Sequence, residues 1–276
     1  MKRRKRKSNT KAEIITGVLY VIFGLIVLAA LYGVGRLAYL MMGTTIGNHY
    51  YAALAEKSTK DGAVDFTSLA AENPEVCAWV RLDDTVIDFP VVHTTDNSYY
   101  LNHLFSEAKN KLGTPFVDAG NSGDFSDRHT VIYGHALKSG AMFGSLWEYE
   151  NPNYFMRHPN IQLFRSDGQQ LTLAVFACSR VEATRGAVPI SFPTEASFLS
   201  FVDDLQQASA FSSSVKITSG DRLVSFCVAL PDGGEGLLLV TCKIAEGGAA
   251  AAADGTTIQQ ITEEPSPSEP AEMPAG

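Results

Sequence analysis

Cysteine is scarce in this sequence and never occurs as a closely spaced pair. The four cysteines are Cys77, Cys178, Cys227 and Cys242. Structural zinc sites draw their ligands from pairs about two to four residues apart, so this spacing indicates no metal site. No motif calls for a cofactor. One or two disulfides are compatible with the sequence, which does not specify a pairing.

Basic residues are rare beyond the first eleven positions. Of the 22 Lys and Arg residues, seven lie in that short segment, which leaves 15 against 30 acidic residues in the rest of the chain. Nucleic-acid binding depends on neutralising phosphates, so this acidic remainder argues against a nucleic-acid partner. The seven basic residues are Lys2, Arg3, Arg4, Lys5, Arg6, Lys7 and Lys11.

Charge is absent from residues 14–35, and about 20 apolar residues of helix can span a bilayer. A cleaved signal peptide is the alternative, but its apolar region is usually about 7–15 residues long. The run is longer and continues as a helix past Arg36, which favours an uncleaved anchor over residues 14–42. The positive-inside rule then predicts a cytoplasmic segment 1–13 and an extracytoplasmic remainder, with the membrane as one partner.

The rest of the chain divides by composition into three parts. Residues 43–68 form a juxtamembrane stretch with helical character, and residues 69–245 form the folded domain. Residues 246–276 are rich in Pro, Ala and Glu and contain no aromatic or basic residue. Such a segment cannot bury enough apolar surface to become ordered, so we expect a disordered acidic tail.

Short apolar segments separated by Asp, Asn, Gly and Ser predict a mostly β domain. The expected strands are 78–81, 86–92, 130–133, 162–164, 171–177, 222–228 and 237–244. Helices are expected over 99–104 and over 195–209, where apolar residues recur at helical spacing and Thr194 and Ser197 are candidate caps. Many short strands with few helices favour a closed or nearly closed β-barrel with peripheral helices.

Three stretches within residues 70–245 carry a family resemblance. Residues 79–105 contain a strand pair followed by an Asp-Asn-x-Tyr-Tyr-Leu element. Residues 113–149 contain Tyr133-Gly134-His135, followed by Met142-Phe143, and residues 198–226 contain a helix and a connecting loop before Asp221-Arg222. In this combination and order the stretches resemble the class B sortases, so the expected fold is a sortase-like closed barrel preceded by one transmembrane helix.

The resemblance implies a cysteine transpeptidase of the cell-wall protein-anchoring system in a Gram-positive-type bacterium. In such enzymes a cysteine attacks a sorting-signal peptide and forms a thioester, which an amine of the peptidoglycan precursor resolves. A histidine acts as acid and base, and an arginine supports the oxyanion. An activated thiolate divides one difficult step into two, and a cation near the oxyanion lowers the barrier.

Residue by residue, the resemblance transfers only in part. His135 falls on the catalytic histidine of the family. The family's Thr-Leu-x-Thr-Cys strand aligns with residues 225–229, which places Ala229 at the nucleophile, and the arginine position falls on Lys243. Lysine keeps the charge but lacks the planar fork of arginine. The remaining histidines match no motif and are expected at surface or packing positions: His49, His93, His103, His129 and His158.

Two hypotheses follow from these departures. In the first, an active transpeptidase uses Cys227, two residues from the motif position, or with less support Cys242, together with His135 and Lys243. In the second, a catalytically impaired homologue binds a peptide, a wall precursor or another membrane protein without turnover. Buried cysteine is often a small apolar residue, and the motif spacing favours the second hypothesis.

Overall fold

The computed structural model describes residues 10–60, 62–182 and 188–245. Most of the predicted basic segment, at 1–9, and the predicted acidic tail, at 246–276, lie outside the described residues.

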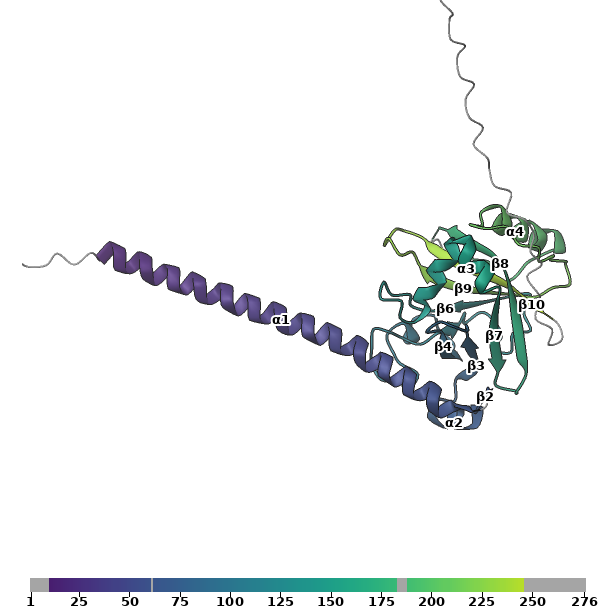
Figure 1. Cartoon of the computed structure of the whole chain (residues 1–276), viewed down its shortest axis with the longest axis horizontal. Coiled ribbons are helices and arrows are strands. Elements are labelled where there is room, and N and C mark those ends of the chain that lie inside the picture. Colours follow the sequence, from purple (N-terminus) through teal and green to yellow (C-terminus); the bar gives the residue numbers. More distant parts are fainter. Residues whose placement is uncertain (1–9, 61, 183–187, 246–276) are drawn as a thin grey trace, which may run out of the picture.

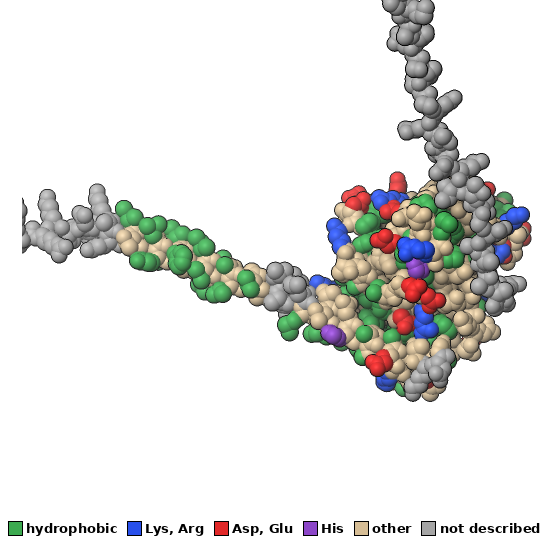
Figure 2. Space-filling view, viewed as in Figure 1, with side chains coloured by type: hydrophobic (Ala, Val, Ile, Leu, Met, Phe, Trp, Pro, Cys, Tyr) green, Lys and Arg blue, Asp and Glu red, His purple; other side chains and the backbone are tan. Residues whose placement is uncertain are grey.

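A single helix, α1 (Thr10–Ser58), runs through the predicted anchor and into the predicted juxtamembrane segment. Its stretch Ile14–Arg36 has a mean hydropathy of 2.7 and no buried part, so it is long and apolar enough to cross a membrane. Figure 1 shows this part of the helix projecting from one side of the barrel, and Figure 2 shows it covered with apolar side chains. An apolar surface all round is typical of a membrane span.

The last turns of α1 pack against the barrel as part of the folded unit. Tyr51 and Leu54 are 2% and 4% exposed and belong to the main core. A Cβ on Gly47 would lie 2.5 Å from Leu112, so glycine permits the close approach of the helix at this point. Further on, the Asn110 side chain donates to the Gly43 carbonyl over 2.8 Å. The packed unit therefore extends back to about residue 43.

Short elements connect α1 to the barrel. Strands β1 (Thr59–Lys60) and β2 (Ala63–Val64) pair as a small hairpin, and α2 (Phe66–Glu72) follows. Asp65 caps α2 by accepting a hydrogen bond from the Ser68 backbone N–H, which satisfies one of the free donors at the helix start.

Eight strands close into a barrel in the order β10-β8-β7-β3-β4-β5-β6-β9. Two neighbouring pairs, β4–β5 and β6–β9, are parallel, and the other barrel pairs are antiparallel. The strands are β3 (Val76–Arg81), β4 (Asp88–His93), β5 (Phe116–Val117), β6 (His129–Tyr133), β7 (Asn160–Arg165), β8 (Gln170–Val181), β9 (Leu223–Ala229) and β10 (Leu237–Ala245).

Apolar side chains form two clusters on the two faces of the barrel wall. The larger cluster contains Trp79, Phe226 and Cys242 and fills the interior. The smaller cluster, called here the outer cluster, lies between the wall and α4 (Glu195–Gln207) and contains Phe198, Cys227 and further residues of β6, β8 and β10. Alternation along β9 sends successive side chains into one cluster or the other.

The mostly β closed barrel with peripheral helices is confirmed, and every predicted strand overlaps an observed one. The helix predicted over 195–209 is α4, and Thr194 and Ser197 form the expected reciprocal capping box. The helix predicted over 99–104 is shorter, a single 3-10 turn, η1 (Tyr99–Leu101). Two further helices, η2 (Phe143–Glu150) and α3 (Pro152–Arg157), were not predicted.

Candidate functional site

His135 lies two residues beyond β6 and is fixed at both its backbone and its ring. Its carbonyl accepts a hydrogen bond from the Phe143 N–H over 2.9 Å. Its ring Nε2 lies 2.8 Å from the Leu101 carbonyl oxygen. A carbonyl can only accept, so Nε2 carries the proton and Nδ1 is left as the acceptor nitrogen. The half-buried ring is thereby held in one tautomer at the end of the barrel.

Ala229 and His135 each lie two residues beyond the last register pair of the parallel strands β6 and β9. Tyr133 is the register partner of Cys227, and the Gly134 N–H donates to the Cys227 carbonyl over 3.3 Å. Two residues further along each chain are His135 and Ala229. The Ala229 side chain is exposed, whereas the other six residues of β9 are buried. The exposed position on β9 beside His135 therefore carries a methyl group.

Cys227 is 2% exposed and lies in the outer cluster. Burial, with a smaller contribution from Asp118, raises the pKa of its thiol to about 12. At pH 7 only about one such thiol in a hundred thousand is ionised. Because the thiolate is the nucleophile in cysteine chemistry, this environment disfavours attack on a peptide.

Cys242 faces the other side of the wall, in the barrel interior, and is fully buried. Its burial raises the pKa of the thiol still further. Among the described residues, no hydrogen bond joins His135 to either cysteine. All four cysteines of the chain are free and buried, so neither of the disulfides that the sequence allows is present.

Lys243 is not brought to His135 or Ala229. It pairs with Leu223, at the opposite end of the β9–β10 hairpin, whereas Ala229 pairs with Leu237. Along β10, Lys243 is six residues from Leu237, the partner of Ala229, which corresponds to about 20 Å of strand. The Lys243 ammonium donates to Asp221 over 2.9 Å, which makes it part of an ion pair.

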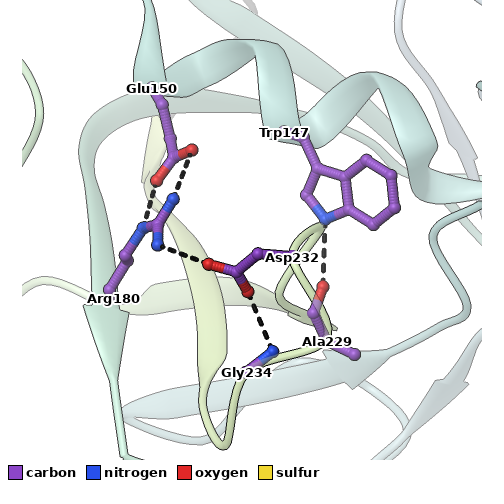
Figure 3. A network of polar contacts seen from close by, with 6 residues as sticks. All are labelled: Trp147, Glu150, Arg180, Ala229, Asp232 and Gly234. Atoms are coloured by element: carbon purple, nitrogen blue, oxygen red, sulfur yellow. Dashed lines mark hydrogen bonds and ion pairs between the residues drawn. The ribbon is translucent and has the colours of Figure 1, made fainter. Parts of the chain in front are cut away.

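An arginine that the sequence did not single out contacts the turn that follows Ala229. Arg180 lies on β8, where it is the register partner of Leu238 on β10. Its guanidinium donates two hydrogen bonds to the Glu150 carboxylate, at 2.5 and 3.0 Å. It also contacts Asp232, at 3.3 Å, in the β9–β10 turn. Figure 3 shows these contacts beside Ala229. The hydrogen bonds that Arg180 donates to Glu150 raise the pKa of Arg180 above its ordinary value, so the guanidinium stays charged.

Trp147 of η2 completes this side of the site. Its indole N–H donates to the Ala229 carbonyl over 3.0 Å (Figure 3). Asp232 accepts from the Gly234 N–H over 2.9 Å, and this bond, with Arg180, lowers the pKa of the Asp232 carboxyl. The turn after Ala229 is thus tied to η2 and β8. The arrangement offers an aromatic surface, charged groups and an imidazole, which suits binding a polar, extended ligand.

The other histidines occupy surface or packing positions. Within the described part of the chain, no group of three His, Cys, Asp or Glu residues could hold a metal ion. His49 is exposed, His93 and His103 are half-buried, and His129 and His158 are buried.

Comparison with known proteins finds sortase B proteins among both the similar sequences and the similar solved structures. Sortase B of Listeria monocytogenes is 29% identical over 174 residues, which cover 62% of this chain and 70% of that protein. The crystal structure of sortase B from Bacillus anthracis in complex with AAEK1 matches with a TM-score of 0.67 and 26% identity, over 74% of this chain and 99% of that one. A Staphylococcus aureus sortase B–substrate complex matches with a TM-score of 0.68 and 24% identity, over 74% and 98%.

No protein-family model matches the chain. The sortase B structures nevertheless share the fold of this closed barrel. Together these comparisons support assignment of the chain to the class B sortase family.

Sequence reasoning predicts His135 and Ala229 as site residues because both lie in linear motifs. It does not single out Arg180, Trp147 and Asp232, which come from β8, η2 and the turn between β9 and β10. Arg180 lies near the end of a long strand with nothing local to mark it. Only the strand order, in which β10 lies between β8 and β9, brings it to the turn that follows Ala229. No signal in one sequence gives that order.

Proposed function

We propose that the protein is a membrane-anchored class B sortase homologue that binds a sorting-signal peptide outside the cytoplasm without forming a thioester. The observation that carries this proposal is the contrast between Ala229 and the four cysteines. Ala229 is exposed and, like His135, lies two residues beyond the last β6–β9 register pair, whereas every cysteine is buried. The position that the family motif assigns to the nucleophile is thus open to solvent but carries no thiol.

The charged groups around Ala229 support peptide binding. The Arg180 side chain is 49% exposed and keeps part of its donor fork open to solvent. Trp147 presents a half-exposed ring beside the same backbone. The homologous Staphylococcus aureus structure is described as a substrate complex, which makes a peptide substrate the natural ligand to test.

The N-terminal apolar helix supports an extracytoplasmic location for the barrel. The apolar stretch Ile14–Arg36 follows a strongly basic N-terminus, and by the positive-inside rule the barrel lies outside the cytoplasm. There it would meet secreted peptides and the amine of a peptidoglycan precursor. Protease treatment of intact protoplasts should digest the barrel and spare an N-terminal epitope, whereas an inaccessible barrel would contradict this orientation.

The enzymatic hypothesis is tested with the full chain in detergent and a panel of quenched fluorescent sorting-signal peptides, with hydroxylamine as the acceptor. We expect binding by fluorescence anisotropy and no cleavage. Cys227→Ala and the matched Cys178→Ala should both behave as the wild type, since both residues are buried thiols with a pKa of about 12.

Cleavage that Cys227→Ala abolishes and Cys178→Ala preserves would contradict the proposal and establish the active alternative. Cleavage lost only in Cys242→Ala would assign the nucleophile to Cys242. Absence of both binding and cleavage across the panel would also contradict the proposal, because it requires a bound peptide.

A further inference from the structure

The loop formed by residues 99–114 lies between α1 and His135. Its Leu101 carbonyl accepts from the His135 ring. Gly113 in the same loop has a positive φ of 63°, and a Cβ there would lie 2.4 Å from the Tyr100 carbonyl and 3.1 Å from Cδ2 of His135. Only glycine fits this backbone and this space. The position of the imidazole thus depends on where the loop is held.

Tyr51, in the part of α1 beyond the apolar span, holds that loop from the other side. Its hydroxyl donates to the Gly113 carbonyl over 2.5 Å and lies 2.9 Å from Oγ1 of Thr114. Tyr51 and Gly113 are both buried. A buried carbonyl that loses its donor costs about 1–3 kcal/mol unless the chain moves to find another. Removing the hydroxyl should therefore displace the loop.

A second set of contacts connects the same tyrosine to the backbone of His135. The Tyr51 ring meets Phe89 edge-on, with centroids 5.3 Å apart, and Phe89 lies 6.5 Å from Phe143. Phe143 packs on Gly134, where a Cβ would lie 2.5 Å from the ring, and its N–H donates to the His135 carbonyl. Tyr51 thus contacts the loop that holds the His135 ring, and through Phe89 it reaches Phe143, which holds the His135 backbone.

We infer that Tyr51 is a positioning residue for His135, so that the helix leaving the apolar span sets the tautomer and direction of the imidazole in the site. The inference rests on the proposed function only where His135 is taken to contact the peptide. The geometry that connects Tyr51 to the imidazole is independent of what the site binds.

The test compares two neighbouring tyrosines that lose the same atom. Tyr51→Phe removes the hydroxyl from Gly113, whereas the control Tyr50→Phe removes a hydroxyl that donates to Glu72 over 2.6 Å and also interacts with Ser106 of the loop, but not with Gly113. Each full-length variant is labelled with ¹⁵N-histidine in detergent micelles. A His135→Gln variant assigns the imidazole signals, and peptide affinity is measured in parallel.

In the wild type, the His135 signals should report a proton fixed on Nε2. In Tyr51→Phe, the two nitrogen shifts should move toward each other as the fixed tautomer is lost, and peptide affinity should fall about five-fold. Tyr50→Phe should change neither readout. The signals of His129, buried at the other end of β6, should stay unchanged and report an intact fold.

Unchanged His135 signals in Tyr51→Phe, or an equal change in Tyr50→Phe, would overturn the inference. Movement of the His129 signals together with those of His135 would also overturn it, because the substitution would then disturb the whole barrel and not the His135 site alone. A shift confined to His135 with unchanged peptide affinity would support the positioning role and contradict the contact between His135 and the peptide.

Discussion

At the scale of single residues, a methyl group stands at position 229, level with His135, and the thiol two residues earlier points into the outer cluster. Cys227 and Ala229 differ little in size but strongly in exposure, since the strand leaves the cover of the outer cluster between them. A thiol at 229 would be solvated, and its pKa would stay near the ordinary value for cysteine, about 8.5.

Ala229→Cys should therefore create a fast-reacting thiol in a protein that otherwise has none. We expect one equivalent of iodoacetamide to be incorporated by the folded variant at pH 8, and none over the same period by the wild type. Both should show their full cysteine content in denaturant, as counted by intact mass. Fast labelling of the wild type, lost on Cys227→Ala, would show that Cys227 is accessible and would contradict the burial described for it.

The residues of the site differ in how far sequence could predict them. His135 follows from a contiguous tripeptide, and Ala229 follows from its distance to Asp221-Arg222. The family pattern predicts the arginine position at Lys243, on the strand that follows Ala229. The hairpin register instead places Leu237 opposite Ala229 and Lys243 near Asp221. A count of residues does not reveal where a hairpin turns, and here the turn occupies seven residues between β9 and β10.

His129 is a fully buried residue whose two ring nitrogens have defined partners. Its Nδ1 lies 2.6 Å from the Pro189 carbonyl and must donate, and its Nε2 lies 2.8 Å from Oγ of Ser225. Thr241 continues the network at 2.8 Å from the same Oγ. A neutral imidazole, with Nε2 accepting from the Ser225 hydroxyl, satisfies this pattern, and burial disfavours the charged ring. Burial lowers the pKa of His129 to about 4.

This pKa predicts a loss of stability on acidification. Above pH 6.5 the imidazole is neutral in the folded and the unfolded chain, so the shift has no effect. Below pH 6.5 the unfolded chain binds a proton that the folded chain excludes until about pH 4. Between pH 7.5 and 5, urea unfolding should show the wild type losing about 2 kcal/mol more than His129→Gln. Parallel curves for the two proteins would contradict the buried neutral state.

At the scale of secondary-structure elements, α4 and the loop before it cover the outer cluster in which Cys227 lies. The start of α4 is fixed by reciprocal bonds between Thr194 and Ser197. Its inner side buries Phe198, Val202 and Leu205. The cover over Cys227 therefore depends partly on a cap that lies at the surface.

Thr194→Ala should lower the free energy of unfolding by about 1 kcal/mol, because one helix N–H loses its acceptor. The matched change Ser200→Ala, at an exposed position inside the same helix, should alter it by no more than a few tenths of a kcal/mol, since alanine favours helix. Urea unfolding measures both. Equal effects would show that the cap bonds contribute nothing specific.

The elements that sequence predicted are those with their own local pattern. The strands are rich in Val, Leu, Ile and Phe, and α4 combines a cap with helical spacing. Strand β5 escaped prediction because two residues, Phe116 and Val117, carry no period, and its pairing with β4 and β6 is decided by the barrel. Helices η2 and α3 are too short for a periodic signal, although Asn151 caps α3 and Pro152 begins it.

At the scale of the whole molecule, the end of α1 belongs to the barrel domain. Tyr51 and Leu54 are buried in the main core, and Asn110 reaches back to Gly43. The sequence predicts a domain entry near residue 69 because the stretch before it reads only as a juxtamembrane helix. Which side of a helix packs on a barrel is a tertiary property that composition does not report.

Removal of residues 1–42 should leave the stability of the barrel nearly unchanged, whereas removal of residues 1–65 should destabilise it by roughly 3–6 kcal/mol. Burying two large apolar side chains contributes about that much, and Tyr51 also bonds to Gly113. Thermal unfolding of the two truncated proteins, followed by circular dichroism, tests the difference. Equal melting temperatures would show that α1 does not stabilise the domain.

The absence of a break in α1 has a consequence for how the protein meets its ligands. The 49 residues of the helix extend for about 74 Å. With Ile14–Arg36 in a bilayer, the barrel cannot tumble on its own, and the site keeps one height and one tilt relative to the lipid surface. Encounters then become a two-dimensional search by lateral diffusion. A peptide tethered to the same membrane at a matching height would meet the site far more often than the same peptide free in solution.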